Sequence, residues 1–151
     1  MLPELGRDRS FMNQWIAVCL GGAVGALLRY GVSVWVSSLA RGAFPLATFV
    51  VNGTGAFALG IVATVATTRP SPAPPLWTTF LAVGLLGSFT TFSTFSWELL
   101  QLLRQGLTRV AVLYLLASLL VGMGGVLAGA WVASRGAWSP APSAPSSSLS
   151  P

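Results

Sequence analysis

The chain has 151 residues, of which 54% are hydrophobic and 7% are charged, whereas soluble globular domains carry about four times as much charge. This composition excludes an ordinary soluble domain, and the lack of histidine, with one cysteine and three carboxylates, leaves few groups for catalysis, so we predict that the protein is not an enzyme. The net charge of +5 comes from arginines that are spread along the chain, so no nucleic-acid partner is predicted.

Four long stretches of the sequence contain no charged residue. They are residues 10–28, 42–68, 70–97 and 110–134. Each stretch is longer than the roughly 18 residues that indicate a membrane-spanning helix. We therefore predict an all-α, multi-pass membrane protein embedded in a lipid bilayer. Its four transmembrane helices are expected at residues 11–39, 46–66, 76–103 and 109–133.

The remaining segments divide the chain into a membrane domain and two tails. Residues 1–10 form a short charged N-terminal tail, 11–135 form the four-helix transmembrane domain, and 136–151 form a Pro/Ser-rich C-terminal tail. We expect both tails to be disordered. The connections between the helices are short, so successive helices should be antiparallel neighbours.

The first predicted helix contains the motif GGAVGALLRY. Gly21 and Gly25 are four residues apart, as are Gly22 and Ala26, and such spacing gives a flat face of the kind by which membrane helices associate. Arg29 lies deep in the same span, where its guanidinium either extends to the interface or faces a wet vestibule that attracts anions. The stretch also resembles a secretory signal, but the three spans that follow favour a transmembrane helix.

The second predicted helix places Asn52 inside the apolar segment FVVNGTGAFALG. An amide in hydrocarbon needs hydrogen-bond partners, and a polar group at this depth is a candidate functional residue. Interhelical hydrogen bonds of this kind are also common and are worth about 1 kcal/mol. Asn52 is therefore either part of a polar site or a contact between helices.

The third predicted helix carries the most informative pattern, GLLGSFTTFSTFSWE at residues 84–98. Thr90, Thr91, Ser93 and Thr94 alternate with phenylalanines after two glycines. Glycine and β-branched residues weaken a helix and hydroxyls compete for its carbonyls, so we predict that this helix is broken near the middle of the membrane. The carbonyls that such a break frees are suitable ligands for a hard cation such as Na⁺.

The fourth predicted helix carries Tyr114 and Ser118 four residues apart, which places them on one face. Alone, this pair is typical of a packing stripe that contains two hydroxyl groups. Together with Asn52 and the hydroxyl residues of the third helix, the pair would complete a polar lane through the membrane.

The arginines are divided almost equally between the two predicted sides of the membrane. One side has Arg7, Arg9, Arg69 and Arg135, and the other has Arg41, Arg104 and Arg109. Because Arg and Lys in short loops set the orientation of a membrane protein, this chain has little preference for one topology. Either another signal fixes the orientation, or the chain inserts both ways round and pairs with an inverted copy.

The motifs GGAVGALLRY, PLATFVVNGTGAF and GLLGSFTTFSTFSWE, in this order and spacing, resemble the signatures of the Fluc (CrcB) fluoride channels over about residues 16–129. The resemblance implies a fluoride-selective channel that lets fluoride leave the cell passively across the inner membrane and so relieves fluoride toxicity. It further implies a dual-topology, antiparallel homodimer with two pores and a structural Na⁺ at the dimer centre.

The resemblance also assigns roles to individual residues by motif position. Backbone carbonyls of Gly87 and Thr90 would hold the Na⁺. The pore would be lined by the amide of Asn52 and the rings of Phe92 and Phe95, with the hydroxyls of Ser93 or Thr94 nearby and, less directly, Tyr114 and Ser118. Arg29 is a further candidate because of its depth in the first span, and not because of a role carried over by motif. The chemistry agrees, because fluoride only accepts hydrogen bonds and these side chains offer N–H, O–H or positive ring edges.

Two other classes of protein share some of these sequence features. A small multidrug exporter, a proton/cation antiporter, also has four short helices, but it needs a membrane carboxylate on its first helix. Here the first helix has Arg29, and the one carboxylate within a span, Glu98, belongs to the third. An assembly protein held together by small-residue packing would need neither Asn52 nor the run of hydroxyls.

Overall fold

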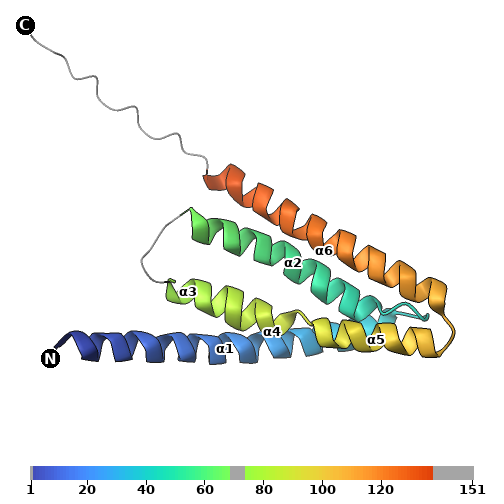
Figure 1. The fold of residues 1–151 in the computed structure, drawn as a ribbon, viewed down its shortest axis with the longest axis horizontal. Helices are drawn as coiled ribbons and strands as arrows, with labels where there is room; N and C mark the ends of the chain where they lie inside the picture. Colours follow the sequence, from blue (N-terminus) through green and yellow to red (C-terminus); the bar gives the residue numbers. More distant parts are fainter. Residues whose placement is uncertain (1, 69–73, 138–151) are drawn as a thin grey trace, which may run out of the picture.

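The computed structural model describes residues 2–68 and 74–137 of the chain. Within these ranges the chain forms α1 (Leu2–Leu39), α2 (Leu46–Thr67), α3 (Leu76–Thr78), the π-helix η1 (Thr79–Leu86), α4 (Gly87–Phe89), α5 (Phe92–Arg104) and α6 (Thr108–Ala137) (Figure 1). The segments long and apolar enough to cross a membrane are Phe11–Leu39, Leu46–Thr67, Leu76–Arg104 and Thr108–Arg135. The prediction of an all-helical, multi-pass membrane protein is confirmed.

The first helix is longer than predicted. It begins at Leu2, so residues 2–10 are helical where we expected a disordered tail. Pro3 lies in the first turn, where a missing N–H costs nothing and the fixed φ of proline suits a helix. The charged residues of this segment do not prevent the chain from continuing the helix. Residues 138–151, most of the predicted C-terminal tail, lie outside the described residues.

The four spans pack mainly as two pairs. α1 lies along η1 and α4, whereas α2 lies along α6, and α1 also contacts α2 (Figure 1). Successive spans run in opposite directions, as the short connections predicted. As a result α2 and α6 run in the same direction, side by side, with α5 packed against the first part of α6.

Glycines allow the helices of each pair to approach closely. A Cβ atom at Gly25 of α1 would overlap the main chain of Leu85 in η1, and one at Gly129 of α6 would overlap the carbonyl of Phe57 in α2. Membrane helices associate through such small residues because lipid offers no hydrophobic driving force between them. The small-residue face of the first helix is therefore a packing surface for the third span.

We expect Gly25→Ala to destabilise the fold by about 1–3 kcal/mol, the usual cost of overpacking a tight contact. Gly31→Ala is the matched control, because a Cβ at Gly31 of the same helix meets no atom of the described residues within 4 Å. Unfolding of the two purified variants in detergent measures the difference. Equal stability of the two variants would show that α1 and η1 do not need this close approach.

The third span changes its helical geometry twice. Residues Thr79–Leu86 form a π-helix, a rare form that occurs mostly as single turns, frequently at functional sites. After α4, Thr90 (φ −77°, ψ 156°) and Thr91 (φ −148°, ψ 117°) are extended, and α5 then begins at Phe92. The span therefore consists of helical segments joined by two extended threonines.

Large apolar side chains cover much of the outer surface. Leu27 is 72% exposed and Leu120 is 74% exposed, which a bilayer tolerates because its tails are as apolar as leucine. The buried residues Phe95, Leu102, Ala111 and Tyr114 form a small core between α5 and α6. This core positions the start of α5 beside α2 and α6.

Candidate functional site

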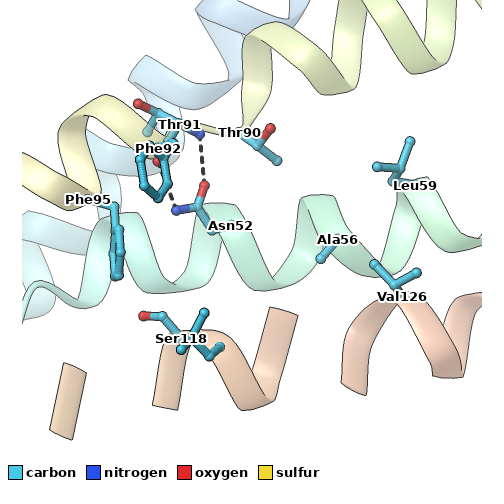
Figure 2. Close-up of a pocket in the computed structure, with 10 residues that line it drawn as sticks. Asn52, Ala56, Leu59, Thr90, Thr91, Phe92, Phe95, Ser118 and Val126 are labelled. Atoms are coloured by element: carbon cyan, nitrogen blue, oxygen red, sulfur yellow. Dashed lines mark hydrogen bonds between the residues drawn. The ribbon is translucent and has the colours of Figure 1, made fainter. Parts of the chain in front are cut away.

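A groove of about 320 Å³ lies where the extended threonines meet α2, α5 and α6 (Figure 2). It is lined by Asn52, Ala56, Leu59, Thr90, Thr91, Phe92, Phe95, Ser118, Leu119 and Val126. Asn52, Thr91 and Ser118 gather at one end, whereas Ala56, Leu59 and Val126 make the other end apolar. The groove therefore brings together polar side chains from the second, third and fourth spans.

The amide of Asn52 holds the backbone of Thr91 through two hydrogen bonds. Its Nδ2 donates to the Thr91 carbonyl at 3.1 Å, and its Oδ1 accepts from the Thr91 N–H at 2.8 Å (Figure 2). Because an amide nitrogen carries two hydrogens, one N–H of Asn52 is left over for the groove. Asn52 thus joins two helices and also lines the groove.

The hydroxyl of Thr91 caps α5. Its Oγ1 accepts from the backbone N–H of Thr94 at 3.2 Å and donates to Oγ1 of Thr94 at 3.0 Å, and it lies 3.3 Å from Oγ of Ser93. A threonine at this N-cap position satisfies an otherwise unpaired donor of the first helical turn. Ser93 and Thr94 are exposed on that turn and do not line the groove.

The two phenylalanines of the groove differ in their surroundings. Phe92 is 80% exposed, whereas Phe95 is 7% exposed and packs on Tyr114 with ring centroids 5.0 Å apart. The centroids of Phe92 and Phe95 are 5.9 Å apart, with an angle of 39° between the ring planes. Phe92 therefore has a free ring on the rim, and Phe95 forms part of the inner wall.

Ser118 lies in the wall opposite Asn52 (Figure 2). Its Oγ is buried and has no hydrogen-bond partner within residues 2–68 and 74–137. A buried hydroxyl without a partner is costly. Ser118 is thus a groove-lining residue whose hydroxyl has no partner among the described residues.

Tyr114 does not line the groove, although it shares a helix face with Ser118. It is fully buried, and its hydroxyl donates to Oε2 of Glu98 at 2.8 Å. Thr48 Oγ1 donates to the other oxygen, Oε1, also at 2.8 Å. Sequence reasoning missed Thr48, although a carboxylate within a span must find donors and thereby signals that such a partner exists.

The other predicted site residues are spread around the groove. Thr90 lines it, with its Oγ1 donating to the carbonyl of Leu86 at 2.9 Å. Gly87 is exposed on α4, one turn before Thr90, and is not among the lining residues. Arg29 is half-buried on α1 and is likewise not one of them.

The fold and the groove define a class of protein: a multi-pass helical membrane protein with a polar groove between its second, third and fourth spans. The sequence model of the family described as "CrcB-like protein, Camphor Resistance (CrcB)" matches residues 16–130. The chain therefore belongs to the CrcB family, and the resemblance seen in its motifs is confirmed.

Curated relatives agree with this assignment. A protein of Roseiflexus sp. (strain RS-1), named fluoride-specific ion channel FluC, is 43% identical over 118 residues, which cover 78% of this chain and 94% of the relative. The protein of the same name from Synechocystis sp. (strain ATCC 27184 / PCC 6803 / Kazusa) is 42% identical over 120 residues, 80% and 92% of the two chains.

Proposed function

We propose that this chain forms a fluoride-selective channel that gives passive fluoride efflux across the cell's inner membrane and so relieves fluoride toxicity. The observation that carries the proposal is the hydroxyl of Ser118, which has no partner in the described part of the chain and belongs to a residue that lines a groove with Asn52 and Phe92. The relatives that are named fluoride-specific ion channels support the same ion.

The donors of the groove suit a small anion that cannot itself donate a hydrogen bond. The spare N–H of Asn52 and the O–H of Ser118 replace water around fluoride, and the positive edge of an aromatic ring such as that of Phe92 adds a weaker contact. Within residues 2–68 and 74–137 no carboxylate lines the groove, and both oxygens of Glu98 accept hydrogen bonds outside it. An anion in the groove therefore meets donors and not a fixed negative charge.

We further propose that two copies of the chain pair in opposite orientations. The nearly level count of arginines at the two ends of the bundle supports insertion both ways round. Phe92, which is 80% exposed, and Gly87, which is also exposed, both lie within the third span, where a second copy would cover them. The dimer would then bring two grooves and two sets of extended threonines together.

Reporter domains fused to the C-terminus test the orientation. We expect signal from both faces of the membrane, because neither end of the bundle has a clear excess of positive charge. Adding three lysines to one connection should fix a single orientation and abolish efflux until an oppositely fixed copy is co-expressed. A wild-type chain found wholly on one side would contradict antiparallel pairing.

A structural Na⁺ is the third part of the proposal, and the backbone carbonyls of Gly87 and Thr90 fit it. In an unbroken α-helix these carbonyls would accept from the N–H groups of Thr91 and Thr94. Those two N–H groups instead donate to Asn52 and to the Thr91 hydroxyl. Carbonyl oxygens are the ligands that a hard cation prefers, and a bound Na⁺ would compensate these polar groups within the membrane.

Liposomes that contain the purified protein and fluoride test the proposed activity. We expect rapid fluoride release when a potassium ionophore balances the charge, with no requirement for ATP or a proton gradient. The same liposomes loaded with chloride serve as the control and should retain it. Release that depends on a proton gradient would instead support a proton-coupled antiporter. Loss of chloride as fast as fluoride would contradict the proposed selectivity for fluoride.

A further inference from the structure

The extended threonines redirect two backbone N–H groups to side chains. The N–H of Thr91 donates to Oδ1 of Asn52 at 2.8 Å, and the N–H of Thr94 donates to Oγ1 of Thr91 at 3.2 Å. Helical geometry would direct the same two donors to the carbonyls of Gly87 and Thr90. Two side chains thus take up the donors that would otherwise pair with two carbonyls.

We propose that Asn52 and Thr91 are positioning residues for a cation site, because they keep the carbonyls of Gly87 and Thr90 free to bind Na⁺. The inference rests on the Na⁺ site of the proposed function and names what maintains it. Asn52 acts through the backbone of Thr91, and Thr91 acts through the backbone of Thr94. Neither side chain needs to touch the ion.

The surroundings hold the extended backbone in place. Asn52 also donates through Nδ2 to the Thr91 carbonyl at 3.1 Å. Its amide therefore hydrogen-bonds to both the backbone N–H and the backbone carbonyl of Thr91. Thr91 is buried, at 8% exposure. A Cβ at Gly55 would overlap Cγ2 of Thr90 and approach Cδ1 of Phe89 to 3.1 Å. Gly55 therefore gives the third span room to lie directly against α2.

Without the Asn52 and Thr91 oxygens as acceptors, the backbone of the third span could return to helical hydrogen bonding. A buried N–H that loses its side-chain partner must find another acceptor, and the nearest in helical geometry is the carbonyl four residues earlier. The Thr94 N–H would then pair with the Thr90 carbonyl and remove it from the cation. Loss of the Thr91 hydroxyl should therefore weaken Na⁺ binding, even though the ligands are backbone atoms.

The same contacts connect the cation site to the anion groove. Asn52 lines the groove and also secures the backbone beside the two carbonyls. A change at Asn52 therefore acts on both sites. Thr91 also lines the groove, but its hydroxyl is hydrogen-bonded to Thr94, so a change there that keeps the shape of the side chain acts on the cation site first. Thr91 is for this reason the residue on which the inference is tested.

The experiment measures how Na⁺ stabilises the purified dimer. Thermal unfolding is followed while Na⁺ replaces N-methylglucamine at constant ionic strength, because a ligand that binds only the folded state raises the melting temperature with its concentration. For Thr91→Val, which keeps the shape but lacks the hydroxyl, the Na⁺ concentration that gives half of the stabilisation should rise about tenfold or more. For Thr91→Ser, which keeps the hydroxyl, this half-maximal Na⁺ concentration should stay within about twofold of the wild-type value.

Ser96→Ala is the matched control. This hydroxyl, on the same helix, donates to the carbonyl of Phe92 at 2.9 Å and takes up neither of the redirected N–H groups. A merely structural role of Thr91 would lower the melting temperature equally at all Na⁺ concentrations and leave the half-maximal concentration unchanged. Thr91→Ala is measured in parallel, so that the result does not depend on the folding of one variant.

The outcomes separate this inference from the proposed function. If the melting temperature of the wild-type dimer does not change with Na⁺ concentration, the proposed Na⁺ site is wrong and so is this inference. The fluoride efflux assay would still test the proposed channel independently. A wild type that responds to Na⁺, with valine and alanine variants that respond at the same concentrations, would overturn the inference alone. The inference is supported if Thr91→Val and Thr91→Ala need a higher Na⁺ concentration for half of the stabilisation while Thr91→Ser stays close to wild type.

Discussion

Replacing Asn52 with aspartate is expected to reduce fluoride efflux about 100-fold or more, because it places a negative charge in the groove that an anion must cross. Two unit charges 4 Å apart repel by about 4 kcal/mol at an effective dielectric constant of about 20, which corresponds to about 1000-fold in rate. The change also removes the N–H group that donates to the Thr91 carbonyl. Efflux from liposomes measures the loss.

Asn13→Asp provides the matched control, because Asn13 is an exposed amide on α1 that lines a separate apolar groove beside α3. The same charge there should leave efflux near the wild-type rate. Dimer mass is measured for both variants to separate loss of permeation from loss of assembly. Wild-type efflux from Asn52→Asp would falsify the assignment of the groove as the fluoride pathway.

Replacing Gly87 with tryptophan should abolish both dimerisation and efflux while the single chain still folds. Among the described residues of one chain, a Cβ at Gly87 meets only the carbonyl of Ala82, at 3.7 Å, which is an ordinary contact. A large side chain at this exposed position therefore has room in one copy and would clash with the second copy that we propose to cover it. Loss of dimer mass with unchanged helical content would be the expected result.

Gly124→Trp is the corresponding control, since Gly124 is exposed on α6 and a Cβ there has no neighbouring atom within 4 Å in the part of the chain that the structure describes. This variant should remain dimeric. Thr90→Ser should also be nearly silent, because it keeps the hydroxyl that donates to Leu86 and leaves the backbone carbonyl in place. An intact, transporting dimer with tryptophan at residue 87 would rule out a cation site and an interface at this position.

The positions of the spans followed from the sequence because membrane insertion depends mainly on apolar length. The four uncharged stretches predicted helices that agree with α2 and α6 to within a few residues, and the motifs identified the CrcB family. The small-residue face at Gly21 and Gly25 was likewise predicted, and its packing partner is η1. The start of α1 at Leu2 was missed, because a helix can continue into water where its charge no longer signals a span.

The character of each span was thus determined by the sequence, but the partner of each polar side chain was decided by the tertiary structure. Four-residue spacing placed Tyr114 and Ser118 on one face, yet Tyr114 is buried against Glu98 and Ser118 faces the groove. Phe92 and Phe95 share a motif, but one is exposed and the other lies in the core. Spacing along a helix fixes which residues share a face, whereas contacts between residues far apart in sequence depend on how the four helices pack against one another.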